Sequence, residues 1–119
     1  MSGKQKSPST TRNRDPILDL LRRVLAPNAR VLEIASGTGE HSIYFTQAMP
    51  GVLWQPSDPD AEARASIAAW IASEGASNVL APLALDVREA MWGVEDCAPF
   101  DAIVAINMIH ISPWGARWV

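Results

Sequence analysis

Apolar positions in the first half of the chain alternate between helical spacing and short continuous runs. Residues 17–25 repeat apolar side chains at helical spacing after Asp15-Pro16, a pair typical of a helix start because aspartate caps and proline fits the first turn. A short run that is apolar except for Glu33 follows at 31–35, and helical spacing returns over 40–48. The pattern predicts a helix, a strand and a second helix.

The same alternation continues through the middle of the chain. Gly51 ends the helical pattern, and residues 52–55 predict a second short strand. The alanine-rich stretch 61–73 predicts a helix that ends near Gly75. A strand–helix–strand order of this kind is typical of βαβ units.

Two more strands are predicted in the last third. Residues 79–85 contain Pro82, which cannot donate to a strand ladder, so we expect this strand at a sheet edge. Residues 100–106 are almost wholly apolar, as expected for a strand buried on both faces of a parallel sheet. The alternation as a whole predicts an α/β fold with a doubly wound parallel sheet.

The last residues predict an incomplete domain. Ser112-Pro113 looks like another helix start, yet the sequence ends at Val119 after barely one turn. The fourth strand would then present an apolar edge, which proteins normally cover. We expect a truncated chain or fragment, with possible self-association through this exposed strand.

Composition limits the classes of function. The chain has 119 residues, is 48% hydrophobic and 19% charged, and carries a net charge of −3, which fits one ordinary globular domain. It has neither the basic excess typical of a nucleic-acid surface nor an apolar run long enough to span a membrane. Cys97 is the only cysteine and His41 and His110 are the only histidines, so we expect no disulfide, no metal site and a cytoplasmic location.

The first 14 residues form a separate segment. They hold four basic residues, no acid and only one apolar side chain, Met1. We expect a disordered basic tail over 1–14 and the folded domain over 15–119.

Three acids fall at the ends of three successive predicted strands: Glu33, Asp58 and Asp86. Each has a structural alternative, since Glu33 could cap a turn, Asp58 could be an N-cap before Pro59, and Asp86 could end its strand. Open parallel sheets bind ligands at the carboxyl ends of their strands. Three acids at equivalent strand ends therefore favour a binding site.

A small-residue loop lies beside the first of these acids. Gly37 and Gly39 allow backbone N–H groups to approach a ligand closely. A carboxylate at Glu33 would repel a phosphate but could receive an ammonium group. The loop therefore favours a nucleoside that carries an amino acid over a dinucleotide.

At these positions the chain resembles a known superfamily. The segment Glu33-Ile-Ala-Ser-Gly-Thr-Gly39 resembles the first motif of class I S-adenosylmethionine-dependent methyltransferases. Asp58 matches the superfamily's acid after strand two, and Asp86-Val87 matches its pair of residues after strand three. More narrowly, four segments are similar to an uncharacterised methyltransferase-like family: Arg12–Ile17, Glu33–His41, Gln55–Pro59 and Asn107–Trp114.

The resemblance implies a Rossmann-like domain with strand order 3-2-1-4 that binds S-adenosylmethionine and transfers its methyl group to an unknown, small-molecule acceptor. Glu33 would order the loop or receive the amino group of the methionine portion. The remaining implied cofactor contacts are Ala35, Ser36, Gly37 and Gly39 in the loop, Asp58 at the ribose, Asp86 and Val87 at the adenine, and Asn107 and Met108 near the methyl group.

Two departures from the superfamily stand out. Ala35 occupies the position of the usual first glycine. Class I enzymes have seven strands, and strands five to seven have no counterpart here, so the chain would be the N-terminal part of such a domain.

Alternatives remain at the sequence level. A nicotinamide dinucleotide fingerprint would place Ser42 at its third small position, and the acid Glu40 is badly placed for a pyrophosphate, so the methyl donor is favoured. A non-catalytic cofactor-binding or interaction module is the other alternative. His110 could be a general base or a pocket wall, and Trp114 could help form a substrate lid, so both are candidates for the substrate pocket.

Overall fold

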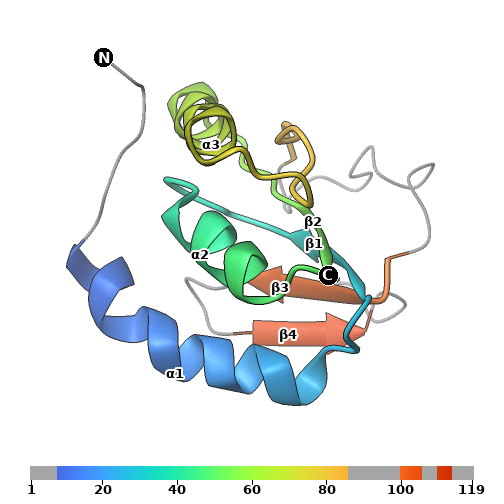
Figure 1. The fold of residues 1–119 in the computed structure, drawn as a ribbon. Helices are drawn as coiled ribbons and strands as arrows, with labels where there is room; N and C mark the ends of the chain where they lie inside the picture. The colour runs from blue at the N-terminus through green and yellow to red at the C-terminus, as the bar shows by residue number, and fades with distance from the viewer. Residues whose placement is uncertain (1–7, 86–99, 106–109, 114–119) are drawn as a thin grey trace.

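The computed structural model describes residues 8–85, 100–105 and 110–113, which form three helices and a four-stranded sheet (Figure 1). The helices are α1 (Pro8–Val24), α2 (Glu40–Ala48) and α3 (Ala61–Glu74), and the strands are β1 (Arg30–Glu33), β2 (Leu53–Gln55), β3 (Ala102–Ala105) and β4 (His110–Pro113). The sheet order is β2-β1-β3-β4.

The central strand β1 pairs in parallel with both of its neighbours. Val31 lies opposite Trp54 of β2 and Ala102 of β3. The predicted α/β class and the parallel order of these three strands are therefore confirmed. The predicted helices over 40–48 and 61–73 are also present, and Gly75 ends the second with a left-handed φ of 61°.

The segment predicted as the third strand does not form a continuous strand. It lies beside β2 through two isolated parallel bridges, Trp54 with Val79 and Ser57 with Leu83. Pro82 lies between these bridges and has no N–H to donate, which interrupts the ladder. The segment still takes the edge position that Pro82 predicts.

The prediction of a helix start at Ser112-Pro113 is wrong. Residues 110–113 form β4, which pairs antiparallel with β3 and places Ile103 opposite Ser112. An apolar strand such as β3 gains from a covered edge, and Pro113 is tolerated because β4 is the outer strand. The edge of β3 is therefore paired with β4, whereas we expected it to be exposed. Self-association stays a prediction, but it cannot use that edge of β3 while β4 covers it.

The first helix begins earlier than predicted. It starts at Pro8 and continues through Pro16, so the helix start at Asp15 is wrong, and residues 8–14 of the expected basic tail lie within this helix. Proline inside a helix removes one backbone hydrogen bond. Contacts with α2 compensate: the Arg14 guanidinium lies 4.4 Å from the centre of the Tyr44 ring, and the Tyr44 hydroxyl donates to Asp15.

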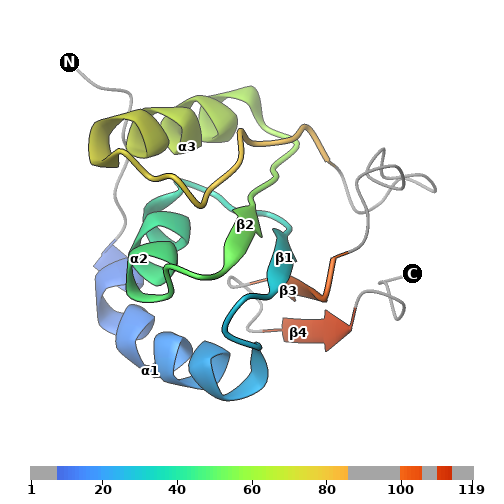
Figure 2. The same cartoon turned by 45° about the vertical axis from the view of Figure 1, so that its right-hand side comes forward.

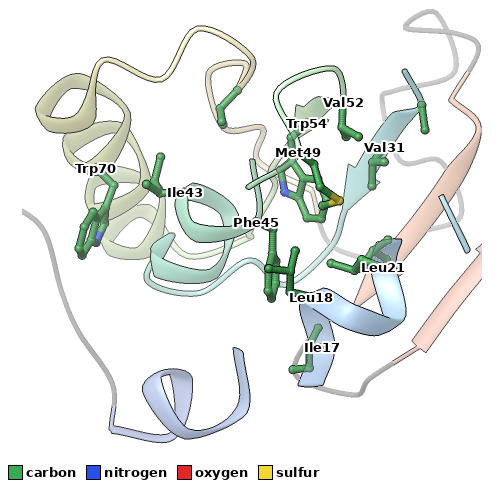
Figure 3. Close-up of a cluster of buried hydrophobic side chains, with 13 residues drawn as sticks. Ile17, Leu18, Leu21, Val31, Ile43, Phe45, Met49, Val52, Trp54 and Trp70 are labelled. Carbon is green, nitrogen blue, oxygen red and sulfur yellow. The ribbon is translucent and has the colours of Figure 1, made fainter. Parts of the chain in front are cut away.

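Two apolar clusters cover the two faces of the sheet. The larger joins α1, α2 and α3 to the face that carries Val31 and Val104, and Figure 3 shows Leu18 of α1 beside Phe45 of α2. The smaller cluster contains Leu32 of β1 and Ile103 of β3, and Leu85 and Phe100 pack with them. All three helices lie on one side of the sheet (Figure 2), so the described part shows one half of the predicted doubly wound arrangement.

None of the three described helices is both long enough and apolar enough to cross a membrane.

Candidate functional site

The loop between β1 and α2 turns sharply at the carboxyl end of the central strand. Three of its residues have left-handed φ angles: Ala35 at 52°, Gly37 at 65° and Gly39 at 90°. Glycine adopts this conformation readily, whereas it costs an L-residue such as alanine about 1–2 kcal/mol. The position where the sequence departs from the superfamily is thus one that favours glycine.

The helix α3 supports the loop from one side. A Cβ added at Gly39 would lie 2.9 Å from the Cα of Ile67, so no larger residue fits without movement of the backbone. The Ser66 hydroxyl donates to the carbonyl of Thr38 at 2.6 Å. The loop is therefore held close against α3.

Asp58 connects the loop to the end of β2. Its Oδ2 accepts from the backbone N–H of Gly37 at 3.0 Å, and its Oδ1 accepts from the N–H of Asp60 at 2.9 Å. The N-cap of α3 is Asp60, which accepts from Ala63, so the alternative that Asp58 is a plain N-cap is wrong. A carboxylate offers about four acceptor positions, so Asp58 retains capacity for further hydrogen bonds.

Glu33 is buried beneath the loop. Its side chain is 1% exposed, and its Oε1 accepts from Ser42 at 2.6 Å and from the indole N–H of Trp54 at 2.9 Å. Burial raises the pKa of this carboxyl, although the hydrogen bonds from Ser42 and Trp54 act in the opposite direction. The carboxyl therefore joins β1, α2 and β2.

Two serines join the ends of β1 and β2. The Ser57 hydroxyl donates to the carbonyl of Glu33 at 2.6 Å, and the backbone N–H of Ser57 donates to the Ser36 hydroxyl at 3.0 Å. The N–H of Ser36 in turn donates to the carbonyl of Ser57 at 2.8 Å. Every polar group in this exchange is buried, which fixes the distance between the loop and Asp58.

The structure brings six of the predicted residues to one edge of the sheet: Glu33, Ala35, Ser36, Gly37, Gly39 and Asp58. Five others lie outside the described residues: Asp86, Val87, Asn107, Met108 and Trp114. The backbone of His110 belongs to β4.

Sequence reasoning missed three residues of this network: Ser42, Trp54 and Ser57. Ser57 could have been suspected because it precedes Asp58 at a strand end. Ser42 and Trp54 carry no sequence signal, since their link to Glu33 depends on how α2 and β2 pack around β1.

His41 follows the loop in the first turn of α2. Its ring stacks on Phe45 with centroids 5.2 Å apart, and its buried Nε2 has no hydrogen-bond partner in the described ranges. Burial lowers the pKa of this imidazole, which favours its neutral form. Residues 8–85, 100–105 and 110–113 contain no group of three or more His, Cys, Asp or Glu placed to hold a metal ion.

Several solved structures that are similar to this chain in fold are methyltransferases. Coclaurine N-methyltransferase bound to N-methylheliamine and S-adenosylhomocysteine aligns over 85% of this chain and 29% of its own, with 18% identity and a TM-score of 0.65. The precorrin-6y C5,15-methyltransferase of Geobacter metallireducens aligns over 77% of this chain and 46% of its own, with 22% identity and a TM-score of 0.62. A methyltransferase of Thiobacillus denitrificans in complex with S-adenosylhomocysteine aligns over 83% of this chain and 36% of its own, with 19% identity and a TM-score of 0.60.

These likenesses define the class of fold. The chain has part of the Rossmann-like fold of class I S-adenosylmethionine-dependent methyltransferases, and it spans less than half the length of each of these three structures. Within that class, the chain belongs to the DUF938 family, described as proteins of unknown function, whose model matches residues 4–118.

Proposed function

We propose that this chain contributes the S-adenosylmethionine-binding part of a methyltransferase whose acceptor is a small molecule. The observation that carries the proposal is the pairing of the loop with Asp58: a turn with three left-handed residues lies hydrogen-bonded to a carboxylate at the next strand end. Solved relatives in fold hold S-adenosylhomocysteine, which supports the same class of ligand here.

Asp58 suits the ribose of such a ligand. The side chain is 9% exposed and is already oriented by the N–H groups of Gly37 and Asp60. Its remaining acceptor capacity fits two neighbouring hydroxyl groups, because a carboxylate accepts from two donors at once. The same residue thus holds the loop and offers acceptors beside it.

Glu33 suits the role of ordering the loop better than that of receiving the ligand's ammonium group. Its carboxyl is buried and engaged by Ser42 and Trp54. Both donors bind Oε1 and the side chain is 1% exposed, so an ammonium group could reach the carboxyl only by opening this buried position. We assign Glu33 the structural one of its two predicted roles.

The rest of the proposed site follows the resemblance. Asp86 and Val87 would bind the adenine, and Asn107 and Met108 would line the region of the methyl group. The bound donor supplies an activated methyl group, and the protein's contribution is to hold donor and acceptor in line and to exclude water. His110 and Trp114 stay candidates for the acceptor pocket.

The proposal is tested by calorimetric titration with S-adenosylhomocysteine, with NAD as the control ligand. We expect the first to bind and NAD not to bind. Asp58→Asn should weaken binding by more than tenfold, about 1.4 kcal/mol, because it replaces acceptors by an amide donor. The matched control is Asp60→Asn, which keeps a good N-cap for α3 and should leave the affinity unchanged.

Circular dichroism on each variant separates loss of binding from loss of fold. Equal affinity of the two variants for S-adenosylhomocysteine would contradict the role of Asp58. Binding without turnover of S-adenosylmethionine, across a panel of small-molecule acceptors, would favour a non-catalytic binding module instead.

A further inference from the structure

A cavity lies at the edge of the sheet opposite the glycine loop, where β1 and β2 begin. Its volume is about 430 Å³, within the usual size range of small-molecule pockets. It is lined by Met49 and Val52, whose buried side chains are labelled in Figure 3, and the more exposed Leu25, Ala26 and Pro27 complete its apolar wall. The glycine loop and Asp58 lie at the other ends of these strands.

The lining of the cavity is held in place by contacts with Asn78 and within itself. The Asn78 amide nitrogen lies within hydrogen-bond distance of the carbonyls of Thr46, Met49 and Val52, at 3.1, 3.3 and 3.0 Å. Gly51 allows this turn to lie against the preceding loop, because a Cβ there would be 2.5 Å from the carbonyl oxygen of Pro27. The walls are therefore held in place before any ligand binds.

Part of the backbone in and beside the lining is already hydrogen-bonded within the chain. At the end of α2, the carbonyls of Phe45, Thr46, Ala48 and Met49 each accept a hydrogen bond from within the chain. On the facing loop, the carbonyl of Ala26 accepts from Ala29 at 3.1 Å. The mostly apolar side chains of the lining favour an apolar ligand chain.

One charge is present in the lining. Among the residues that the structure describes, Arg22 in the last turn of α1 is the only charged one that lines the cavity, and its guanidinium contacts the carbonyl of Ala48 at a long 3.4 Å. Arginine has five N–H donors, so it can hold this contact and still bind a carboxylate. A single cation beside an apolar cavity complements an apolar chain that ends in an anion.

We propose that this cavity binds an aliphatic monocarboxylate, such as a medium-chain fatty acid, with its chain against Met49 and Val52 and its carboxylate at Arg22. This ligand is separate from the proposed methyl donor and occupies the other edge of the sheet. The inference therefore goes beyond the proposed function and does not depend on it.

The test is a titration of the full chain with dodecanoate below its micelle concentration, followed by calorimetry and by backbone amide NMR shifts. We expect saturable binding at one site, with shifts at Met49, Gly51 and Val52. Arg22→Gln should weaken dodecanoate binding about three- to fivefold, the effect of one exposed charge pair. It should leave the binding of the uncharged analogue dodecanol unchanged.

Two further variants locate the ligand. Arg23→Gln removes a neighbouring exposed charge that does not line the cavity, and it should leave the affinity unchanged. Ala26→Trp should fill the cavity and abolish binding, with circular dichroism to confirm the fold.

The proposal is overturned by absence of saturable binding, by equal losses in Arg22→Gln and Arg23→Gln, or by full binding to a folded Ala26→Trp variant. It is also overturned if sedimentation shows a dimer that dodecanoate leaves intact and that Ala26→Trp dissociates. That result would assign the cavity to a second copy of the chain.

Discussion

The two edges of the sheet are built in opposite ways. At the carboxyl edge, the backbone turns through left-handed residues and the polar side chains of Glu33 and Asp58 hold it in place. At the amino edge, Asn78 and Arg22 donate hydrogen bonds to carbonyl groups at the end of α2, and the cavity beside them is mostly apolar. One edge has retained acceptor capacity, and the other has retained apolar surface.

The difference supports the proposal that a polar ligand binds at the loop. A ligand rich in hydroxyl and amino groups needs polar side chains to bind, which Asp58 provides and the mostly apolar lining of the cavity does not. The strain at Ala35 also lies at the polar edge, as is common at functional sites. Four substitutions test this comparison, in order of expected effect.

Gly39→Ala should have the largest effect. The new Cβ would meet the backbone of Ile67, and the alanine would have to keep a left-handed φ. We therefore expect a loss of about 2–4 kcal/mol in the free energy of unfolding. Urea denaturation measures the loss, and titration with S-adenosylhomocysteine should show impaired binding in any folded fraction.

The matched control for this substitution is Gly75→Ala. Gly75 also has a left-handed φ, but a Cβ there would meet nothing within 4 Å, so we expect only about 1 kcal/mol. Equal losses at the two glycines would contradict the close contact between the loop and α3.

Asn78→Asp tests the opposite edge. It replaces an amide donor by a carboxylate that faces three carbonyl oxygens, so we expect destabilisation by about 2–3 kcal/mol at neutral pH. The exposed Asn28→Asp serves as the control and should change stability little. Affinity of the folded Asn78→Asp variant for S-adenosylhomocysteine should stay unchanged, and a large loss of affinity would show that the two edges are coupled.

Glu33→Gln tests the buried carboxyl through pH. Because burial raises the pKa of Glu33 in the folded state, the protonated form is favoured by folding. Its contribution is fully present below the pKa of the unfolded chain and is lost as pH rises through the folded pKa. The stability of the wild type relative to Glu33→Gln should therefore increase as pH falls from neutral, as followed by urea denaturation at several pH values.

A pH-independent difference between these two proteins would show that Glu33 has the same pKa in the folded and unfolded chain. The opposite slope would mean that the hydrogen bonds from Ser42 and Trp54 outweigh burial.

Ala35→Gly should have the smallest effect on the free energy of unfolding, and this substitution should stabilise the protein. Glycine relieves the left-handed φ of 52°, so we expect stabilisation by about 0.5–1 kcal/mol. Ala68→Gly, on the exposed side of α3, is the control and should destabilise by about 1 kcal/mol. Destabilisation at both alanines would mean that the loop is not strained at Ala35.

The sequence was sufficient to predict the elements that apolar spacing defines. The strand 31–35, the helix 40–48 and the glycine loop between them are present within one or two residues. The position of Asp58 beside that loop also followed, because parallel strands end at the same edge. These features depend on local pattern and on parallel topology.

The errors arose where packing decides the structure. The pair Asp15-Pro16 resembles a helix start, but contacts of Arg14 and Asp15 with Tyr44 extend the helix through it. Residues 110–113 pair with β3 because an apolar edge is available, which no local signal shows. The buried partners of Glu33 depend in the same way on three elements that meet in space.

The central claim is that a ligand carrying adenosine and an amino acid binds at the carboxyl edge and not at the amino edge. Backbone amide NMR shifts during titration with S-adenosylhomocysteine test it most directly. We predict the largest shifts at Gly37, Gly39 and Asp58, and none at Met49, Gly51 or Val52. Shifts confined to the second group, or no shifts in a folded chain, would contradict the account.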